Sequence, residues 1–225
     1  MDKKKVISWT LYDWANSAFA TTVMAGFFPI FFEKYWSNPE LVDESTFYLG
    51  LSNSIASLIV AAMAPFLGAI SDTGSTKKKF LFTFAFLGIL ATSLLWVVEQ
   101  GDWQLAAILY AVGCIGFSSG NVFYDSLLPS VAKKDELDLV SSLGFSIGYL
   151  GGGILFVVNI LMYQNPEWFG IPDPTTAIRL SFITVAIWWA VFSIPIFLFV
   201  PEKKNNENSS FGEAVSLGLI QLKKT

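Results

Sequence analysis

The sequence contains no histidine and only one cysteine, Cys114. The lack of histidine excludes zinc sites with imidazole ligands and mechanisms in which a histidine acts as the general base. A single cysteine excludes a disulfide bond within the chain. Phosphate-binding loops (G-x-x-x-x-G-K-[ST]), nucleophile elbows (G-x-S-x-G) and H-E-x-x-H metal motifs are also missing. We therefore expect no bound metal, no cofactor and no enzymatic activity.

Charged residues are scarce as well. They make up 14% of the 225 residues, against about 25% in soluble domains, whereas 53% of the chain is hydrophobic and 21 residues are phenylalanine. A soluble domain of this size could not bury so much apolar surface. No basic patch with interleaved aromatic residues is present, so nucleic acid is not an expected partner. The composition instead predicts a membrane protein whose partner is the lipid bilayer.

Six apolar stretches are long enough to cross a hydrocarbon core about 30 Å thick, which needs about 20 residues. They are Val6–Phe32, Phe47–Ile70, Phe80–Val98, Gln104–Leu128, Leu143–Tyr163 and Ile178–Val200. We predict an all-α membrane protein in which residues 1–200 form a bundle of six transmembrane helices.

The basic residues predict the orientation of this bundle, because lysine and arginine are enriched in cytoplasmic segments. Twelve of the 14 basic residues fall on one side if the spans alternate. The opposite side carries only Lys34 and Arg179. We expect both termini in the cytoplasm, and a location in the plasma (inner) membrane if the source is bacterial.

Residues 201–225 have a different character. The polar stretch after Val200 predicts a cytoplasmic linker, and a surface helix is expected to follow it. Ser210 and Glu213 have the spacing of a capping box, and apolar residues recur at helical intervals from Phe211 to Leu222.

The segment between the second and third spans reads GAISDTGSTKKK, from Gly68 to Lys79. It resembles the loop motif of the major facilitator superfamily, G-x-x-x-D-[RK]-x-G-[RK]-[RK]. Gly68, Asp72 and Gly74 match, and the lysines that begin at Lys77 and Lys78 stand for the basic run. Thr73 departs from the motif, and two extra residues precede the lysines. The resemblance implies a gating role for this segment. In that role Gly68 allows close approach to a neighbouring helix, and Asp72 caps a helix N-terminus or pairs with a cation in one of two states.

Two further stretches narrow the resemblance. YDWANSAFATTV, near the N-terminus, and NVFYDSLLPSVA, at the end of the fourth span, resemble the vacuole-effluxer-like branch of that superfamily. The branch includes autophagy-related amino-acid effluxers and bacterial relatives. The resemblance implies twelve spans in two halves, so we expect this chain to be the N-terminal half of a major facilitator fold. It also implies a secondary transporter that exports a small polar metabolite such as an amino acid, completed by a C-terminal six-helix half.

Polar residues form one stripe in each of two spans. Asp13 and Asn16 lie one turn apart in the first span, and Ser118, Asn121 and Asp125 share a face of the fourth. Charged groups inside spans are costly and usually face a cavity or a partner. In the major facilitator fold, helices one and four both line the central cavity. The resemblance therefore implies that the two polar stripes meet at this cavity, on its cytoplasmic side.

Three roles are open for Asp13: proton coupling, recognition of a substrate amine, and a structural role satisfied by backbone N–H groups or a nearby tyrosine, Tyr12 or Tyr124. It lies seven residues after Val6, about 10 Å along a helix, so in the inner leaflet, which favours the structural role. Glycines of the fifth span, such as Gly148, are interpreted as helix-packing positions.

Two alternatives remain. One is a drug or metabolite proton antiporter of the same superfamily, which would differ only in substrate. The other is a six-span membrane protein that works as a homodimer.

Overall fold

The computed structural model describes residues 2–37, 42–73 and 76–202. These residues are almost entirely helical, and no strand occurs among them. The helices are α1 (Lys3–Ala18), α2 (Phe28–Phe31), α3 (Val42–Thr73), α4 (Lys77–Leu94), α5 (Trp103–Ser126), α6 (Leu137–Gln164) and α7 (Pro174–Phe199), with short π- and 3₁₀-helical segments between some of them. Gly74 and the predicted linker and surface helix around Ser210–Leu222 lie outside the described residues.

The prediction of six membrane-spanning helices is confirmed. Within the described residues, six helical stretches are long and apolar enough to cross a membrane. The first of them runs from Lys3 to Trp36, longer than the predicted Val6–Phe32, because α1 and α2 are joined without a break by π-helical turns at Phe19–Phe27 and followed by more at Phe32–Trp36. The all-α class inferred from composition is therefore correct.

The π-helical turns of the first span surround Pro29. Proline has no N–H to donate to the preceding turn, so the regular α-helical bonding pattern cannot continue through it. Gly26 lies in these turns against the ring of Phe156 on α6, and a β-carbon there would come within 2.6 Å of that ring. The wider turns thus bring the first span close to α6, and such turns recur at functional sites in other helices.

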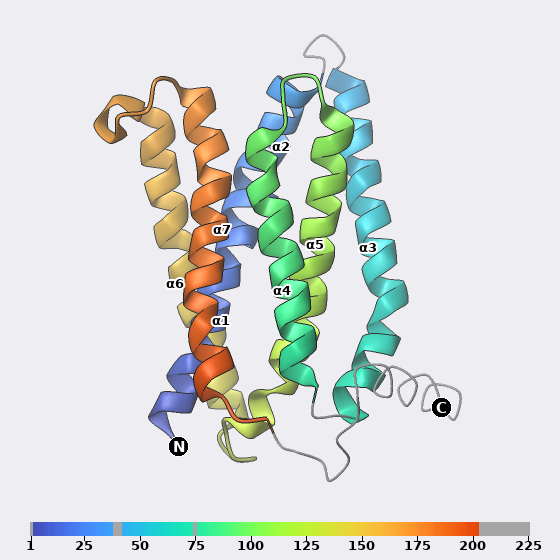
Figure 1. The fold of residues 1–225 in the computed structure, drawn as a ribbon, viewed down its shortest axis with the longest axis vertical. Coiled ribbons are helices and arrows are strands. Elements are labelled where there is room, and N and C mark those ends of the chain that lie inside the picture. The colour runs from blue at the N-terminus through green and yellow to red at the C-terminus, as the bar shows by residue number, and fades with distance from the viewer. Residues whose placement is uncertain (1, 38–41, 74–75, 203–225) are drawn as a thin grey trace.

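The first span lies at the centre of the bundle. It packs against α6 and α7, while α5 packs against α3 and α4, and contacts between α4 and α7 join the two groups (Figure 1). Of an apolar 18-residue stretch of the first span, 56% is buried inside the bundle, whereas the corresponding stretch of α3 is 22% buried. Helix α3 stands at one edge of the bundle. Residues on the first span are therefore placed to meet several helices at once.

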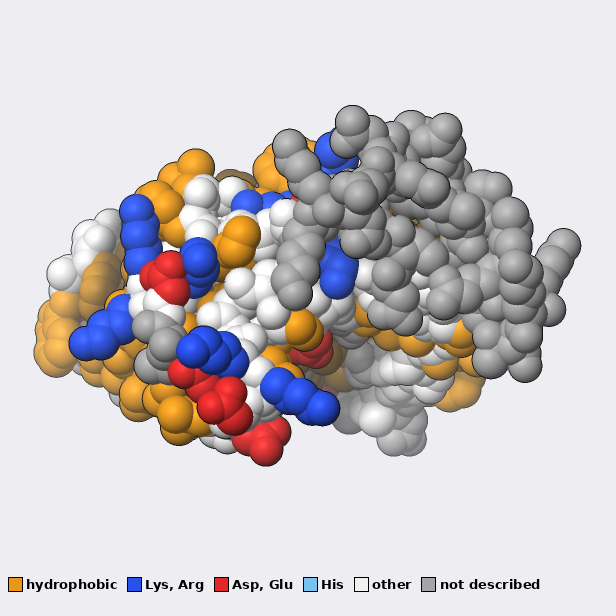
Figure 2. All heavy atoms as spheres, turned by 90° about the horizontal axis from the view of Figure 1, so that it is seen from below, with side chains coloured by type: hydrophobic (Ala, Val, Ile, Leu, Met, Phe, Trp, Pro, Cys, Tyr) orange, Lys and Arg blue, Asp and Glu red, His pale blue; other side chains and the backbone are white. Residues whose placement is uncertain are grey.

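The start of α1 and the end of α7 lie at the same end of the bundle, together with the start of α4 and the start of α6 (Figure 1). Seen from that end, lysine side chains gather over the helix termini (Figure 2). At the opposite end, Asp173 caps α7 by accepting hydrogen bonds from the Thr176 backbone N–H at 2.9 Å and hydroxyl at 2.7 Å. These bonds hold the pKa of the Asp173 carboxyl below its usual value.

Two large clusters of buried side chains fill the bundle, one toward each end, and a third, small cluster is formed by Met162, Ile171 and Ala177. The cluster toward the lysine-bearing end is built on Trp9, Tyr12, Leu81, Phe123 and Tyr124, all less than 5% exposed. Where α6 faces α1, its contact surface consists of glycines, which lets the two helices approach closely.

Several helices keep apolar faces without a partner among the described residues, and those of α3 and α6 are examples. Leu58 on α3 is 70% exposed, and Phe145 and Tyr149 on α6 are 61% and 75% exposed. In a membrane such faces meet either lipid or further helices.

Candidate functional site

The two polar stripes predicted from the sequence meet between the first span and α5. The Asn16 side-chain amide donates a hydrogen bond of 2.6 Å to the side-chain oxygen of Asn121. Asn16 is only 1% exposed, and its own side-chain oxygen has no hydrogen-bond partner among the described residues. This pair is the centre of what we call the polar seam, made of Asp13, Asn16, Ser17 and Asn121.

Asp13 lies one turn before Asn16 and points toward α6. A β-carbon placed on Gly148 of α6 would come within 2.8 Å of the Asp13 carboxyl carbon and of the Ser17 hydroxyl oxygen. The glycine therefore makes the room in which the half-buried carboxyl group sits. The packing interpretation is supported for Gly144, Gly148, Gly151 and Gly152 but not for Gly153, which has no described neighbour within 4 Å of a β-carbon. Gly148 in addition shapes the surroundings of Asp13, which the sequence did not reveal.

The hydrogen bonding of Asp13 is sparse. Ser17 donates its hydroxyl to the carboxylate at 3.4 Å, a long distance for such a bond. Within the described residues, no lysine or arginine forms an ion pair with Asp13, and no backbone N–H donates to it. A carboxylate inside a span is normally better satisfied than this, so the group retains capacity to accept a hydrogen bond from water or from a ligand.

The tyrosines considered as partners of Asp13 do not serve as such. The hydroxyl groups of Tyr12 and Tyr124 are buried without a hydrogen-bond partner in the described part of the chain. Tyr124 instead stacks on Trp9, with ring centroids 4.3 Å apart, and its backbone carbonyl accepts a hydrogen bond of 3.0 Å from the Trp9 indole. Of the donors considered for Asp13, neither tyrosine hydroxyl bonds to it, and the Ser17 hydroxyl does so instead.

Asp125 and Ser118 extend the stripe of α5 to either side of Asn121. Asp125 is exposed, and its charge is near enough to act on Asp13. Ser118 is half-buried, and no hydrogen bond from its side chain to another described residue is present. The structure therefore brings Asp13, Asn16 and Asn121 together, with Asp125 close by, and leaves Ser118 as a neighbour on the same face.

The predicted gating segment is mostly helical. Gly68 and Asp72 belong to α3, which continues to Thr73, and Lys77 and Lys78 are the first residues of α4. A β-carbon on Gly68 would meet no described atom within 4 Å, so the close helix contact expected there is not made within the described chain. The side chain of Asp72 lies outside the described part of the structure.

Lys77 and Lys78 tie the start of α4 to the ends of two neighbouring helices. The Lys77 ammonium donates to the Ser126 carbonyl at the end of α5 at 3.0 Å, and the Lys78 ammonium donates to the Phe197 carbonyl near the end of α7 at 2.8 Å. Cations are unfavourable at their own helix N-terminus but stabilise the negative C-termini of neighbouring helices. The two lysines therefore join three helices at this end.

Glu202 completes this arrangement and was not singled out from the sequence. Its carboxylate accepts a hydrogen bond from the Lys77 backbone N–H at the start of α4, where negative charge is favourable. Burial nevertheless raises the pKa of the Glu202 carboxyl above its usual value. No sequence motif marks this residue, because it follows α7 by three positions and meets α4 only in the folded bundle.

The described residues offer no evident place for a metal ion. Among them, no three histidine, cysteine, aspartate or glutamate side chains gather closely enough to hold one. The chemistry available at the polar seam is therefore hydrogen bonding and carboxylate charge.

Comparison with known proteins places these features in context. Residues 41–225 match the family model described as "Vacuole effluxer Atg22 like". The chain is 37% identical over 202 residues to an uncharacterized MFS-type transporter, YxiO, of Bacillus subtilis, covering 89% of this chain and 47% of that protein. It is also 21% identical over 249 residues to autophagy-related protein 22 of Eremothecium gossypii, covering 92% of this chain and 48% of that protein. The chain thus spans about half the length of these curated relatives. No solved structure matches it.

Proposed function

Because the chain belongs to the Atg22-like vacuole effluxer family, we propose that it is the N-terminal half of a secondary transporter that exports a small polar metabolite, such as an amino acid. The observation that carries the proposal is the polar seam. A half-buried carboxylate and an asparagine pair with one buried member, Asn16, are costly inside membrane spans unless they face a cavity or ligand. Transport of a polar molecule through the bundle requires groups of this kind.

The proposal includes a second six-helix half. The relatives are about twice as long as this chain, which supports it. The apolar faces of α3 and α6 without a described partner, around Leu58 and Tyr149, offer surfaces for that half. In transporters built from two repeats, the substrate site lies near the midplane between them. The polar seam would then form one wall of the site.

We also propose that the lysine-bearing end faces the cytoplasm, following the charge asymmetry of the loops. Trp168, 71% exposed in the connection between α6 and α7, gives a direct test. With Cys114 replaced by alanine, a Trp168→Cys variant should react with a membrane-impermeant thiol reagent added outside intact cells. Reaction only after the cells are opened would contradict this orientation.

The function is tested by counterflow in proteoliposomes that contain the full-length protein. Vesicles loaded with one unlabelled amino acid are exposed to a trace of the same amino acid in labelled form, across a panel of the twenty. The same assay is run with a panel of labelled cationic drugs. We expect accumulation of label for a subset of the panel. If cationic drugs but no amino acid accumulate, the protein is instead an antiporter of the drug class. Accumulation of neither would contradict the proposal.

A further inference from the structure

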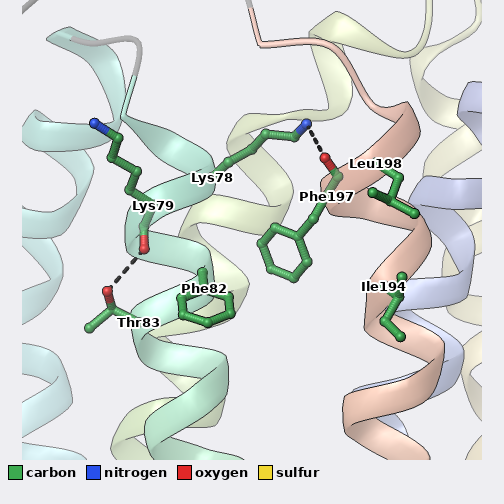
Figure 3. A pocket seen from close by; sticks show the side chains of 7 residues that line it. All are labelled: Lys78, Lys79, Phe82, Thr83, Ile194, Phe197 and Leu198. Atoms are coloured by element: carbon green, nitrogen blue, oxygen red, sulfur yellow. Dashed lines mark hydrogen bonds between the residues drawn. The ribbon is translucent and has the colours of Figure 1, made fainter.

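A groove separate from the polar seam runs along the outside of the bundle between α4 and α7. It has a volume of about 580 Å³. Lys78 and Lys79 both line its polar end, where the Lys78 side chain reaches toward α7 and the Lys79 side chain points away from α7 (Figure 3). Phe82, Ile194 and Leu198 lie along its length. The groove therefore combines a cationic end, at the level of the helix termini, with an apolar floor that extends into the membrane region.

The cationic end retains capacity for an anion. The Lys78 ammonium reaches across the groove to the Phe197 carbonyl, and this single bond leaves two of its three N–H donors for other partners (Figure 3). The nearby charge of Glu202 acts on Lys78 and offsets part of its positive charge. Lys79 is exposed and forms no ion pair with any carboxylate in the described ranges. The net positive charge of the groove therefore lies mainly on Lys79.

The floor of the groove is apolar and open. Phe82, Ile194 and Leu198 are 57%, 51% and 65% exposed, and the ring of Phe197 stands edge-on to that of Phe82 at 5.7 Å. Ile194 and Leu198 are one helical turn apart, so the floor continues for about 6 Å below the lysines. This length and chemistry suit the first carbons of an acyl chain whose headgroup lies level with the lysines.

We propose that this groove binds one phospholipid with an anionic headgroup, with its phosphate near Lys78, level with the charge of Lys79, and an acyl chain along Phe82 and Ile194. Two observations support a lipid over a soluble ligand: the apolar floor belongs to helices that cross the membrane, and the cations lie at the helix ends where headgroups are found. Basic pockets between transmembrane helices on the cytoplasmic side recognise anionic lipids in this way. The charge at the polar end selects an anionic over a zwitterionic headgroup.

The test is native mass spectrometry of the purified, delipidated protein, titrated with dioleoyl phosphatidylglycerol or dioleoyl phosphatidylcholine. We expect the first bound phosphatidylglycerol to be retained at least fivefold better than phosphatidylcholine. Lys79→Gln should weaken that binding about fivefold, the effect of one basic residue near an anionic membrane surface. Lys79 is the variant of choice, because its side chain, unlike that of Lys78, makes no bond to a helix end.

Lys134→Gln is the matched control, because Lys134 is exposed and is not among the residues that line the groove. It belongs to the connection between α5 and α6, which lies at the same end of the bundle (Figure 1). It should leave the affinity for phosphatidylglycerol unchanged, whereas Ile194→Trp, which fills the floor, should weaken it. Equal affinities for the two lipids, or equal losses in Lys79→Gln and Lys134→Gln, would overturn the proposal. A photoreactive residue at Phe82 should capture lipid; capture of a segment of this same chain would show that the groove has another occupant.

Discussion

Gly148 on α6 lies so close to Asp13 on α1 that a β-carbon at this position would come within 2.8 Å of the Asp13 carboxyl carbon. No larger residue leaves the carboxyl group in its present place. The glycine and the aspartate are 135 positions apart in the sequence and act as one unit in the bundle. The side chain of Asp13 is therefore positioned by the absence of a side chain on its neighbour.

The first prediction concerns Gly148→Ala. We expect the added methyl group to displace the Asp13 side chain and lower the transport rate of the full-length protein about tenfold. The thermal midpoint of unfolding should change little, because the atoms that the methyl group meets are the ends of the Asp13 and Ser17 side chains, which can move aside. Gly153→Ala is the control: a β-carbon there would meet no described atom within 4 Å, and the substitution brings the same gain in helix propensity. Equal transport rates in the two variants would contradict this account of Gly148.

The second prediction concerns the asparagine pair. Asn121→Leu should leave the buried Asn16 amide without its partner and destabilise the protein by about 1 kcal/mol. The double variant Asn16→Leu/Asn121→Leu removes both polar groups and should recover part of that loss. Thermal unfolding in detergent of the two single variants and the double variant completes the cycle. Strictly additive losses would mean that the 2.6 Å hydrogen bond does not contribute to stability.

The third prediction separates the roles of Asp13. The sequence favoured a structural role, but the structure gives the carboxylate one long bond from Ser17, which asparagine can also accept. We therefore expect Asp13→Asn to shift the thermal midpoint by no more than about 2 °C, roughly 1 kcal/mol or less. Under proton coupling, it should abolish transport driven by a pH gradient, while exchange of substrate down its own gradient persists. A fall of both activities together with a lower midpoint would restore the structural role.

A fourth prediction concerns pH. Because burial raises the pKa of Glu202 in the folded protein, this group contributes stability below its ordinary value of 4.5, and the contribution is lost as the pH rises through the higher folded value. Glu202→Gln keeps an oxygen for the Lys77 N–H but cannot ionise. The stability of the wild type relative to this variant should fall as the pH rises above 4.5, measured by thermal unfolding at a series of pH values. A difference that stays constant across this series would contradict the effect of burial on Glu202.

Much of the fold could be predicted from the sequence because hydrophobic length is a local property. The six spans follow from runs of apolar residues, and their ends shift by a few positions where helices continue past the hydrophobic core, as α3 does through Asp72 to Thr73. The meeting of Asn16 and Asn121 was expected only through the family resemblance. Periodicity places each residue on a helix face but does not say which faces meet.

The remaining features depend on tertiary contacts that no local pattern encodes. The room that Gly148 provides for Asp13, the bonds from Lys77 and Lys78 to other helices, and the contact of Glu202 with α4 join positions far apart in the chain. Of the donors that the sequence left open for Asp13, Tyr124 does not bond to it, and its ring is stacked on Trp9. The sequence could not show which glycine of α6 makes room for Asp13, since the glycines differ only in the atoms that each one contacts.

The central claim is that the polar seam lines the path of the substrate. Replacing Ser118 by cysteine tests this claim with little disturbance of the fold, because the two side chains are similar in size. Ser118 is half-buried and lies one turn before Asn121 on α5. In full-length protein in which Cys114 and any other cysteine are replaced by alanine, a Ser118→Cys variant should react with a charged, water-soluble methanethiosulfonate reagent, and transported substrate should slow the reaction. Ile187→Cys, on the exposed apolar face of α7, is the control and should not react. An unreactive Ser118→Cys, or labelling that every transported substrate leaves unchanged, would contradict the claim.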